Sequence, residues 1–135
     1  MSRTTWVVVA NASRARIFVN SGPGKGLQLL KELLHPQSRE KGIDLVSDRP
    51  NNPALGPKQN EADHFAQEVA RELEGGRVNQ RFAQLVIIAS LPFHGVLNAR
   101  LTDQVKSFVS HSIEKDYTHA LEKELAQRLE TVMIV

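Results

Sequence analysis

The sequence contains no cysteine, few aromatic residues and no long hydrophobic run. Without cysteine the chain can form no disulfide, no thiolate metal site and no cysteine nucleophile, which fits a reducing compartment. The first apolar run, residues 6–10, is too short for the core of a signal peptide or for a membrane span. We therefore expect a cytoplasmic protein with no membrane partner. Aromatic residues make up only 5% of the chain, so a dedicated platform for stacking nucleic-acid bases is not expected.

Length and charge indicate one globular domain with an uneven charge distribution. The 135 residues, 41% of them hydrophobic and 24% charged, predict a single domain over residues 1–135. Residues 1–60 hold nine Lys and Arg against four Asp and Glu, whereas the remainder holds eight against eleven. This asymmetry favours a polyanionic partner at one face, although scattered, solvated charges give the same count.

The first third of the chain predicts three strands. β-Branched and aromatic residues in 6–10 and 15–19 are typical of strands, with a turn at 11–14 between them. The glycine-rich segment 21–26 marks a turn, and 27–34 then predicts a third strand. Three consecutive strands indicate an antiparallel meander.

A long polar segment and a helix follow. Residues 35–59 carry four prolines and no hydrophobic periodicity, which predicts a long loop. Apolar residues at helical spacing predict a helix over 61–74, with Asn60 as its N-cap and Gly75-Gly76 as its end.

The second half predicts alternating strands and helices. The apolar run 85–90 indicates a central strand covered on both faces, and 91–101 reads as a loop entering a short helix. Thr102 is placed to cap a helix over 103–109. A strand near 110–115 precedes a last helix, whose predicted cap is Thr118 and whose stripe is Leu121, Leu125 and Leu129.

The resulting order, βββαβαβα, is the order of a three-layer, ribonuclease-H-like α/β fold, in which a mixed sheet of about five strands is flanked by helices. Nucleases of that plan hold two divalent cations about 4 Å apart with carboxylates on the first and fourth strands. This chain offers Asn11 and Ser90 at those strand ends, and no acid within either strand. The five histidines show no metal-ligand spacing. We therefore predict no metal, no cofactor and no two-metal nuclease.

Several segments, in order and over nearly the whole chain, carry a resemblance to a known family. They are Val8–Phe18, the Asp44–Pro50 loop, Phe65–Ala70, Leu85–Ala89 and Glu114–His119. Together they resemble the bacterial family named "protein required for attachment to host cells". That family is in turn similar to the middle domain of archaeal and eukaryotic peptide-chain release factors, which implies the same fold.

The release-factor resemblance also implies a candidate residue for hydrolysis. In those proteins a Gly-Gly-Gln tip on a long loop promotes ester hydrolysis of peptidyl-tRNA. The equivalent segment here is Gly56-Pro-Lys-Gln59, in which Pro57 fixes φ and lacks the N–H that a second glycine would supply. Gln59 is therefore a candidate for hydrolysis, and the alternative is an ordinary residue leading into a helix.

The candidate binding residues fall into three groups. Asn11, Ser13, Arg14 and Arg16 offer amide, hydroxyl and guanidinium donors to phosphate, although the arginines are equally able to pair with Asp116 and hold the sheet. Lys115 and Asp116 either join a site or connect a strand to a helix cap. Phe93 and His94 follow the central strand, where α/β sheets tend to bind ligands.

These residues favour recognition over catalysis. We expect a non-catalytic binding factor of the translation apparatus or another RNA-containing partner, such as the ribosome. The alternatives are a peptidyl-tRNA ester hydrolase that uses Gln59, and an indirect role in adhesion to host cells. The apolar tail, residues 131–135, is expected to pack on the chain's own sheet or to form a homodimer.

Overall fold

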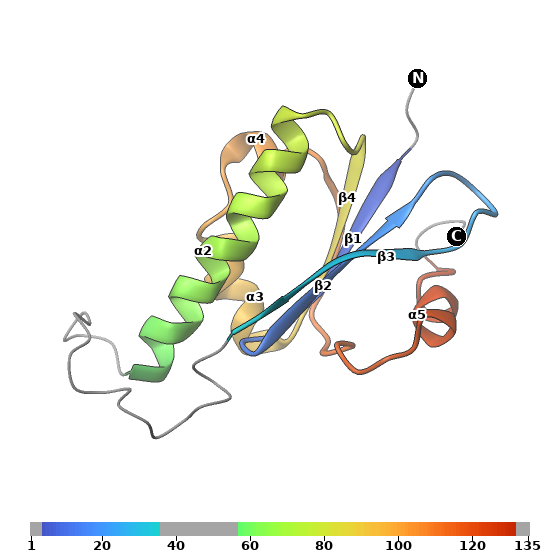
Figure 1. The fold of residues 1–135 in the computed structure, drawn as a ribbon. Coiled ribbons are helices and arrows are strands. Elements are labelled where there is room, and N and C mark those ends of the chain that lie inside the picture. The colour runs from blue at the N-terminus through green and yellow to red at the C-terminus, as the bar shows by residue number, and fades with distance from the viewer. Residues whose placement is uncertain (1–3, 36–56, 132–135) are drawn as a thin grey trace.

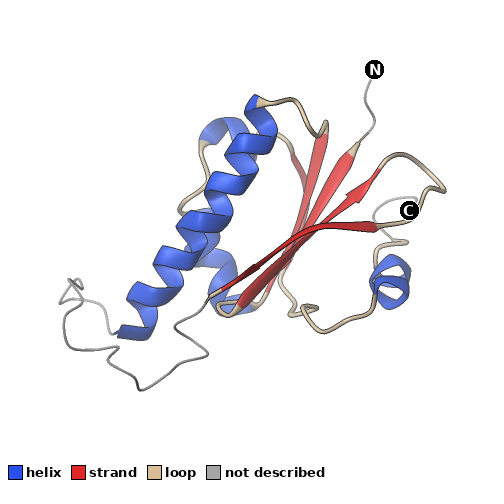
Figure 2. Ribbon diagram, viewed as in Figure 1, coloured by secondary structure: helices blue, strands red, loops and turns tan. Residues whose placement is uncertain are grey.

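A computed structural model describes residues 4–35 and 57–131, with side chains left out for 57–60 (Figure 1). These residues form one five-stranded sheet with helices on both faces. The strands are β1 (Thr5–Ala10), β2 (Arg14–Asn20), β3 (Gln28–Leu34), β4 (Gln84–Ala89) and β5 (Val109–Ile113). The helices are α2 (Pro57–Val78), α3 (Leu91–Asn98), α4 (Asp103–Lys106) and α5 (Glu122–Arg128). The three-layer, ribonuclease-H-like α/β architecture predicted from the sequence is confirmed (Figure 2).

The strand order across the sheet is β3-β2-β1-β4-β5. The first three strands form an antiparallel meander, whereas β4 is parallel to both β1 and β5. Every residue of β1 is buried, and β4 is covered on both faces as its apolar run predicts. Because β1 and β4 run parallel, with Ala10 opposite Ala89, the carboxyl ends of these two strands lie side by side at one edge.

Two hydrophobic layers hold the helices to the sheet. On one face, α2 packs with α3 and α4 against every second residue of β1: Trp6, Val8 and Ala10. Helix α2 contributes Phe65, Val69 and Leu73 to this layer. On the other face, Leu125 and Leu129 pack against Val7, Val9 and Phe18. Fully burying each such side chain contributes roughly 1.5–3 kcal/mol. Because successive side chains of a strand point to opposite faces, β1 contributes to both layers.

Helix α2 is longer than its sequence predicts at both ends. It begins at Pro57 in place of a cap at Asn60, since proline suits the first turn of a helix. It also continues through Gly75-Gly76, and a Cβ at Gly76 would lie 2.6 Å from the Trp6 ring. That glycine therefore permits close approach of helix and sheet. The helix ends at Val78, and the chain turns at Gln80 (φ 56°), where Gln80 N–H donates to Arg77 O and Arg81 N–H donates to Gly76 O.

The carboxyl-terminal elements differ from prediction in detail. Thr102 caps α4 as predicted, since its hydroxyl accepts a hydrogen bond from Val105 N–H at 3.1 Å. That helix ends at Lys106, however, and β5 begins at Val109. Thr118 does not cap the last helix, which begins at Glu122. Leu121 precedes that helix and is 69% exposed, so only the other two leucines of the predicted stripe reach the core.

Residues 132–135 lie outside the described residues, as does most of the predicted loop 35–59. The predicted homodimer through residues 131–135 therefore stays a prediction. No helix in the described ranges is long and apolar enough to cross a membrane.

Candidate binding site at the carboxyl edge of the sheet

The β1–β2 hairpin is closed by the side chain of Asn11. Its amide oxygen accepts hydrogen bonds from the N–H groups of Ser13 at 2.8 Å and of Arg14 at 3.0 Å. The Asn11 N–H in turn donates to Arg14 O at 2.9 Å. Asparagine favours such turns because its short side chain bonds the backbone two residues further on. This closure leaves the Asn11 amide nitrogen pointing away from the hairpin.

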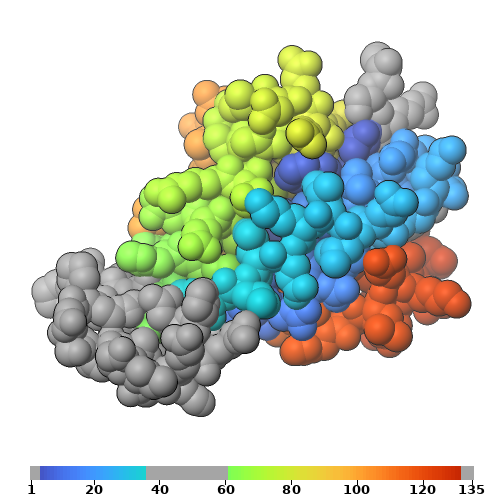
Figure 3. Space-filling model, in the orientation of Figure 1, coloured from blue at the N-terminus to red at the C-terminus, as the bar shows by residue number. Residues whose placement is uncertain are grey.

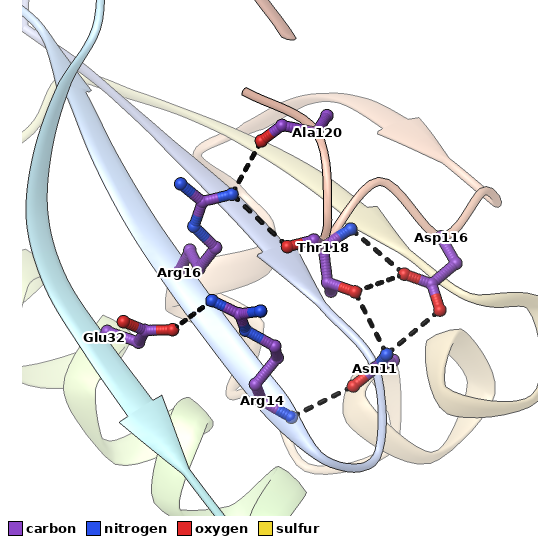
Figure 4. A network of polar contacts seen from close by, with 7 residues as sticks. All are labelled: Asn11, Arg14, Arg16, Glu32, Asp116, Thr118 and Ala120. Carbon is purple, nitrogen blue, oxygen red and sulfur yellow. Dashed lines mark hydrogen bonds and ion pairs between the residues drawn. The ribbon is translucent and has the colours of Figure 1, made fainter. Parts of the chain in front are cut away.

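That amide nitrogen joins the hairpin to the segment that follows β5. It donates to Asp116 Oδ2 at 3.0 Å and to Thr118 Oγ1 at 3.1 Å (Figure 4). Thr118 is fully buried, and its hydroxyl donates to Asp116 Oδ1 at 2.6 Å while its N–H donates to the same oxygen at 3.0 Å. Every polar atom of the Asn11 side chain is thus used within the protein.

Asp116 is held as a carboxylate by these donors. Burial by itself raises the pKa of Asp116, but the hydrogen bonds from Asn11 and Thr118, and the nearby His119, outweigh it. The pKa of Asp116 therefore lies below its ordinary value.

The two hairpin arginines are also held by internal contacts. Arg16 Nη1 donates to Ala120 O at 2.8 Å and to Thr118 O at 3.3 Å, and its guanidinium lies 4.9 Å from the centre of the Phe18 ring. Arg14 pairs with Glu32 on β3. The arginines therefore hold the sheet, but through Glu32 and backbone carbonyls, whereas Asp116 bonds Asn11 (Figure 4).

A cavity of about 440 Å³ opens beside this network, where β1 and β4 end. Its volume lies within the range of small-ligand sites. It is lined by the hairpin, by one residue of α2 and by residues around α3: Asn11, Ala12, Ser13, Ala62, Ser90, Pro92, Phe93 and Val96. Phe93 is only 2% exposed and forms an apolar wall, and the Ser90 side chain makes no capping hydrogen bond to α3.

Of the predicted site residues, Asn11, Ser13 and Phe93 meet at this cavity, while His94 and Lys115 are not among its lining residues. His94 lies against β5, where its Nε2 contacts Ser112 Oγ and its Nδ1 lies 3.7 Å from Glu114 Oε2. Lys115 is exposed.

Gln59 falls in the first turn of α2 and not in the loop that its predicted role assumes. Its hydrolytic role stays a prediction.

Sequence reasoning missed the lining contributed by Ala62 and Val96, and it gave Thr118 a different role. Alanine and valine on a helix carry no chemical signal, and a threonine before a leucine stripe looks like a cap. Within residues 4–35 and 57–131, no group of three His, Asp or Glu side chains is placed to hold a metal ion.

Fold and site together define an α/β domain with a ligand-sized cavity at the carboxyl ends of two parallel strands. The chain belongs to the family described as "Protein required for attachment to host cells", which matches residues 6–129. The comparison with curated proteins found no match.

Two solved structures share this fold. The archaeal translation termination factor aRF1 is 15% identical with a TM-score of 0.57, covering 96% of this chain and 35% of that one. A structure described as "Archaeal protein" is 14% identical with a TM-score of 0.55, covering 96% and 34%. This chain thus spans about a third of each of them, and the likeness shows the fold.

Proposed function

We propose that this protein is a binding factor without chemistry of its own, which acts in the cytoplasm on the ribosome or another RNA-containing partner. One observation carries the proposal: among the residues that the structure describes, the cavity at the carboxyl edge of the sheet is lined by neutral polar groups and an aromatic wall, with no carboxylate. Such a lining recognises a ligand, but it holds no acid or base for hydrolysis.

The groups left to meet a ligand are few and well placed. Asn11 is saturated by internal hydrogen bonds, so the hydroxyls of Ser13 and Ser90 remain as donors and acceptors beside Phe93. Proteins commonly recognise unpaired RNA bases with an aromatic side chain and a few hydrogen bonds to the base edge. A cavity of about 440 Å³ is large enough for one such group.

The likeness to aRF1 supports a partner in translation. That protein is a translation termination factor, and the structural match to it covers 96% of this chain. Fold alone does not transfer function, so the likeness has to be tested by a binding experiment. The ribosome is the first partner to test, because translation termination takes place on it.

The test compares two single substitutions that add the same charge at exposed alanines. Ala12→Glu places a carboxylate at the hairpin tip on the cavity rim, whereas Ala83→Glu places one before β4, away from the cavity. Co-sedimentation with ribosomes over a salt series is expected to weaken at least tenfold for Ala12→Glu and to stay unchanged for Ala83→Glu. The proposal fails when the unmodified protein does not co-sediment, or when both variants bind equally well. A lysate pull-down with and without ribonuclease extends the test to other RNA-containing partners.

The double variant Arg14→Ala with Arg16→Ala tests the hairpin guanidiniums. Arg14 pairs with Glu32 and Arg16 bonds backbone carbonyls, so the double substitution also removes contacts that hold the sheet. The unfolding midpoint of the double variant is therefore measured together with its ribosome binding.

The same ribosomes test the hydrolytic alternative. Peptide release from peptidyl-tRNA that disappears in Gln59→Ala would replace the binding role with ester hydrolysis. Cell fractionation tests the role in adhesion by comparing the surface fraction with the ribosome fraction. A protein recovered only with ribosomes would act on attachment indirectly.

A further inference from the structure

A second cavity lies at the opposite end of the central strand, on the α2 side of the sheet. It measures about 370 Å³ and is bounded by β3 and by the last turns of α2, which lie side by side in Figure 3. Its lining is Trp6, Leu30, Lys31, Arg71, Glu72, Gly75, Gly76, Asn79 and Arg81. Trp6 is the second residue of β1 and Asn11 follows the end of that strand, so about 16 Å of strand separates this cavity from the one described above.

The cationic groups around this cavity outnumber the anionic ones. Lys31 Nζ lies 2.7 Å from Glu72 Oε2, so that ammonium already has a carboxylate partner. Arg71 and Arg81 form no ion pair with any residue that the structure describes. Two exposed arginines without an ion-pair partner among the described residues therefore line the cavity, and guanidinium groups suit phosphate oxygens.

The wall of the cavity adds neutral donors. Trp6 is 6% exposed, and its indole N–H has no acceptor within the described part of the chain. Gly76 brings α2 against the Trp6 ring, since a Cβ there would lie 2.6 Å away. The Trp6 ring also packs on Phe82 at a centroid distance of 4.9 Å, so only its edge is available to a ligand.

We propose that this cavity binds the phosphate group of a nucleotide or of an RNA strand, with Arg71 and Arg81 as its charged ligands. The edge-on indole offers a hydrogen bond and not a stacking surface, so recognition centres on the phosphate and sugar. The site is independent of the carboxyl-edge cavity, and neither proposal requires the other.

The chain provides its own reporter, because Trp6 is the only tryptophan. The ¹⁵N-labelled full chain therefore gives one indole cross-peak in an NMR spectrum. Adenosine 5′-monophosphate and a 12-nucleotide single-stranded RNA are titrated separately, with adenosine as the control that lacks phosphate. We expect a saturable shift of the indole peak with the phosphate-bearing probes and none with adenosine.

Substitutions then assign the charged ligands. Arg71→Gln and Arg81→Gln are each expected to weaken binding of the same probes about tenfold. Arg128→Gln removes the same charge on α5, where the guanidinium lies over Tyr117, and is expected to leave binding unchanged. Arg71 and Arg81 are exposed and make no ion pair with another described residue, so both variants should fold.

The outcomes separate the two sources of phosphate. Saturation by the RNA at a concentration at least tenfold below that of the mononucleotide identifies an RNA strand, and the reverse order identifies a free nucleotide. Absence of a saturable shift with both probes, or a shift unchanged by Arg71→Gln and Arg81→Gln, overturns the proposal. Ribosome binding by Ala12→Glu is a separate measurement, so failure of one proposal is distinguishable from failure of the other.

Discussion

Asn11 Nδ2 lies 3.0 Å from Asp116 Oδ2, although 105 residues separate the two in the chain. The bond ties the first hairpin to the segment between β5 and α5. It is a neutral donor on a charged acceptor, and because the bond is exposed to solvent its contribution lies at or below the lower end of the about 1.5–3 kcal/mol typical of that class.

Exchanging the two side chains tests this bond. Asn11→Asp places a second carboxylate beside Asp116 and removes the donor, so we expect it to destabilise the fold by about 1–2 kcal/mol in urea unfolding. Adding Asp116→Asn restores one donor and one acceptor, and the double variant should recover at least half of that loss. A double variant less stable than Asn11→Asp would contradict the direct pairing.

Thr118 contributes through its hydroxyl and not through its shape. Thr118→Val keeps the volume but leaves Asn11 and Asp116 with one partner fewer, which should cost about 1–3 kcal/mol. Thr118→Ser keeps the hydroxyl and serves as the matched control, with an expected loss smaller than that of Thr118→Val. Thermal unfolding compares the three proteins, and equal midpoints for Thr118→Val and the unmodified protein would remove the hydroxyl from the network.

The depressed pKa of Asp116 predicts an acid-sensitive contribution to stability. Because the folded pKa lies below the unfolded value of about 3.9, the contribution is complete above that pH and is lost as pH falls through the folded pKa. The stability difference between the unmodified protein and Asp116→Asn should therefore be constant from pH 7 to 5 and shrink from pH 4 to 2. Urea unfolding across this range measures it, and a difference that grows on acidification would reverse the assigned direction.

Two adjacent glycines in α2 should respond oppositely to alanine. A Cβ at Gly75 meets nothing within 4 Å, so Gly75→Ala should stabilise the protein by about 0.5–1 kcal/mol through helix propensity. A Cβ at Gly76 would lie 2.6 Å from Trp6, so Gly76→Ala should cost about 1–3 kcal/mol. Each variant controls for the other in chemical denaturation, and stabilisation by both would show that helix and sheet separate easily.

The elements of this fold were predictable where local pattern is strong, and their ends were not. The apolar run of β4 and the β-branched and aromatic residues of β1 and β2 indicated their strands, since each signal depends on neighbours in sequence. Gly75-Gly76 looked like a helix end because glycine disfavours helices in isolation. In the folded protein the helix continues through both glycines, and Gly76 leaves room for the Trp6 ring, a contact that no local pattern records.

The candidate site was predictable residue by residue but not as an arrangement. Asn11, Ser13 and Phe93 were identified from their strand ends and do meet at one cavity. The sequence indicated that the arginines are able to hold the sheet, but it did not indicate their partners. Glu32 reaches Arg14 through the pairing of β2 with β3, and the carbonyl of Ala120 reaches Arg16 because the segment after β5 returns to β2.

The sequence by itself determined the absence of disulfides, the family and the order of strands and helices, because composition and short-range periodicity are properties of the chain. The tertiary structure alone decided that Asn11 meets Asp116, that Gly76 admits Trp6, and that Arg71 and Arg81 share a cavity. These contacts depend on strand order, register and helix placement, which bring together side chains that have no local reason to be neighbours.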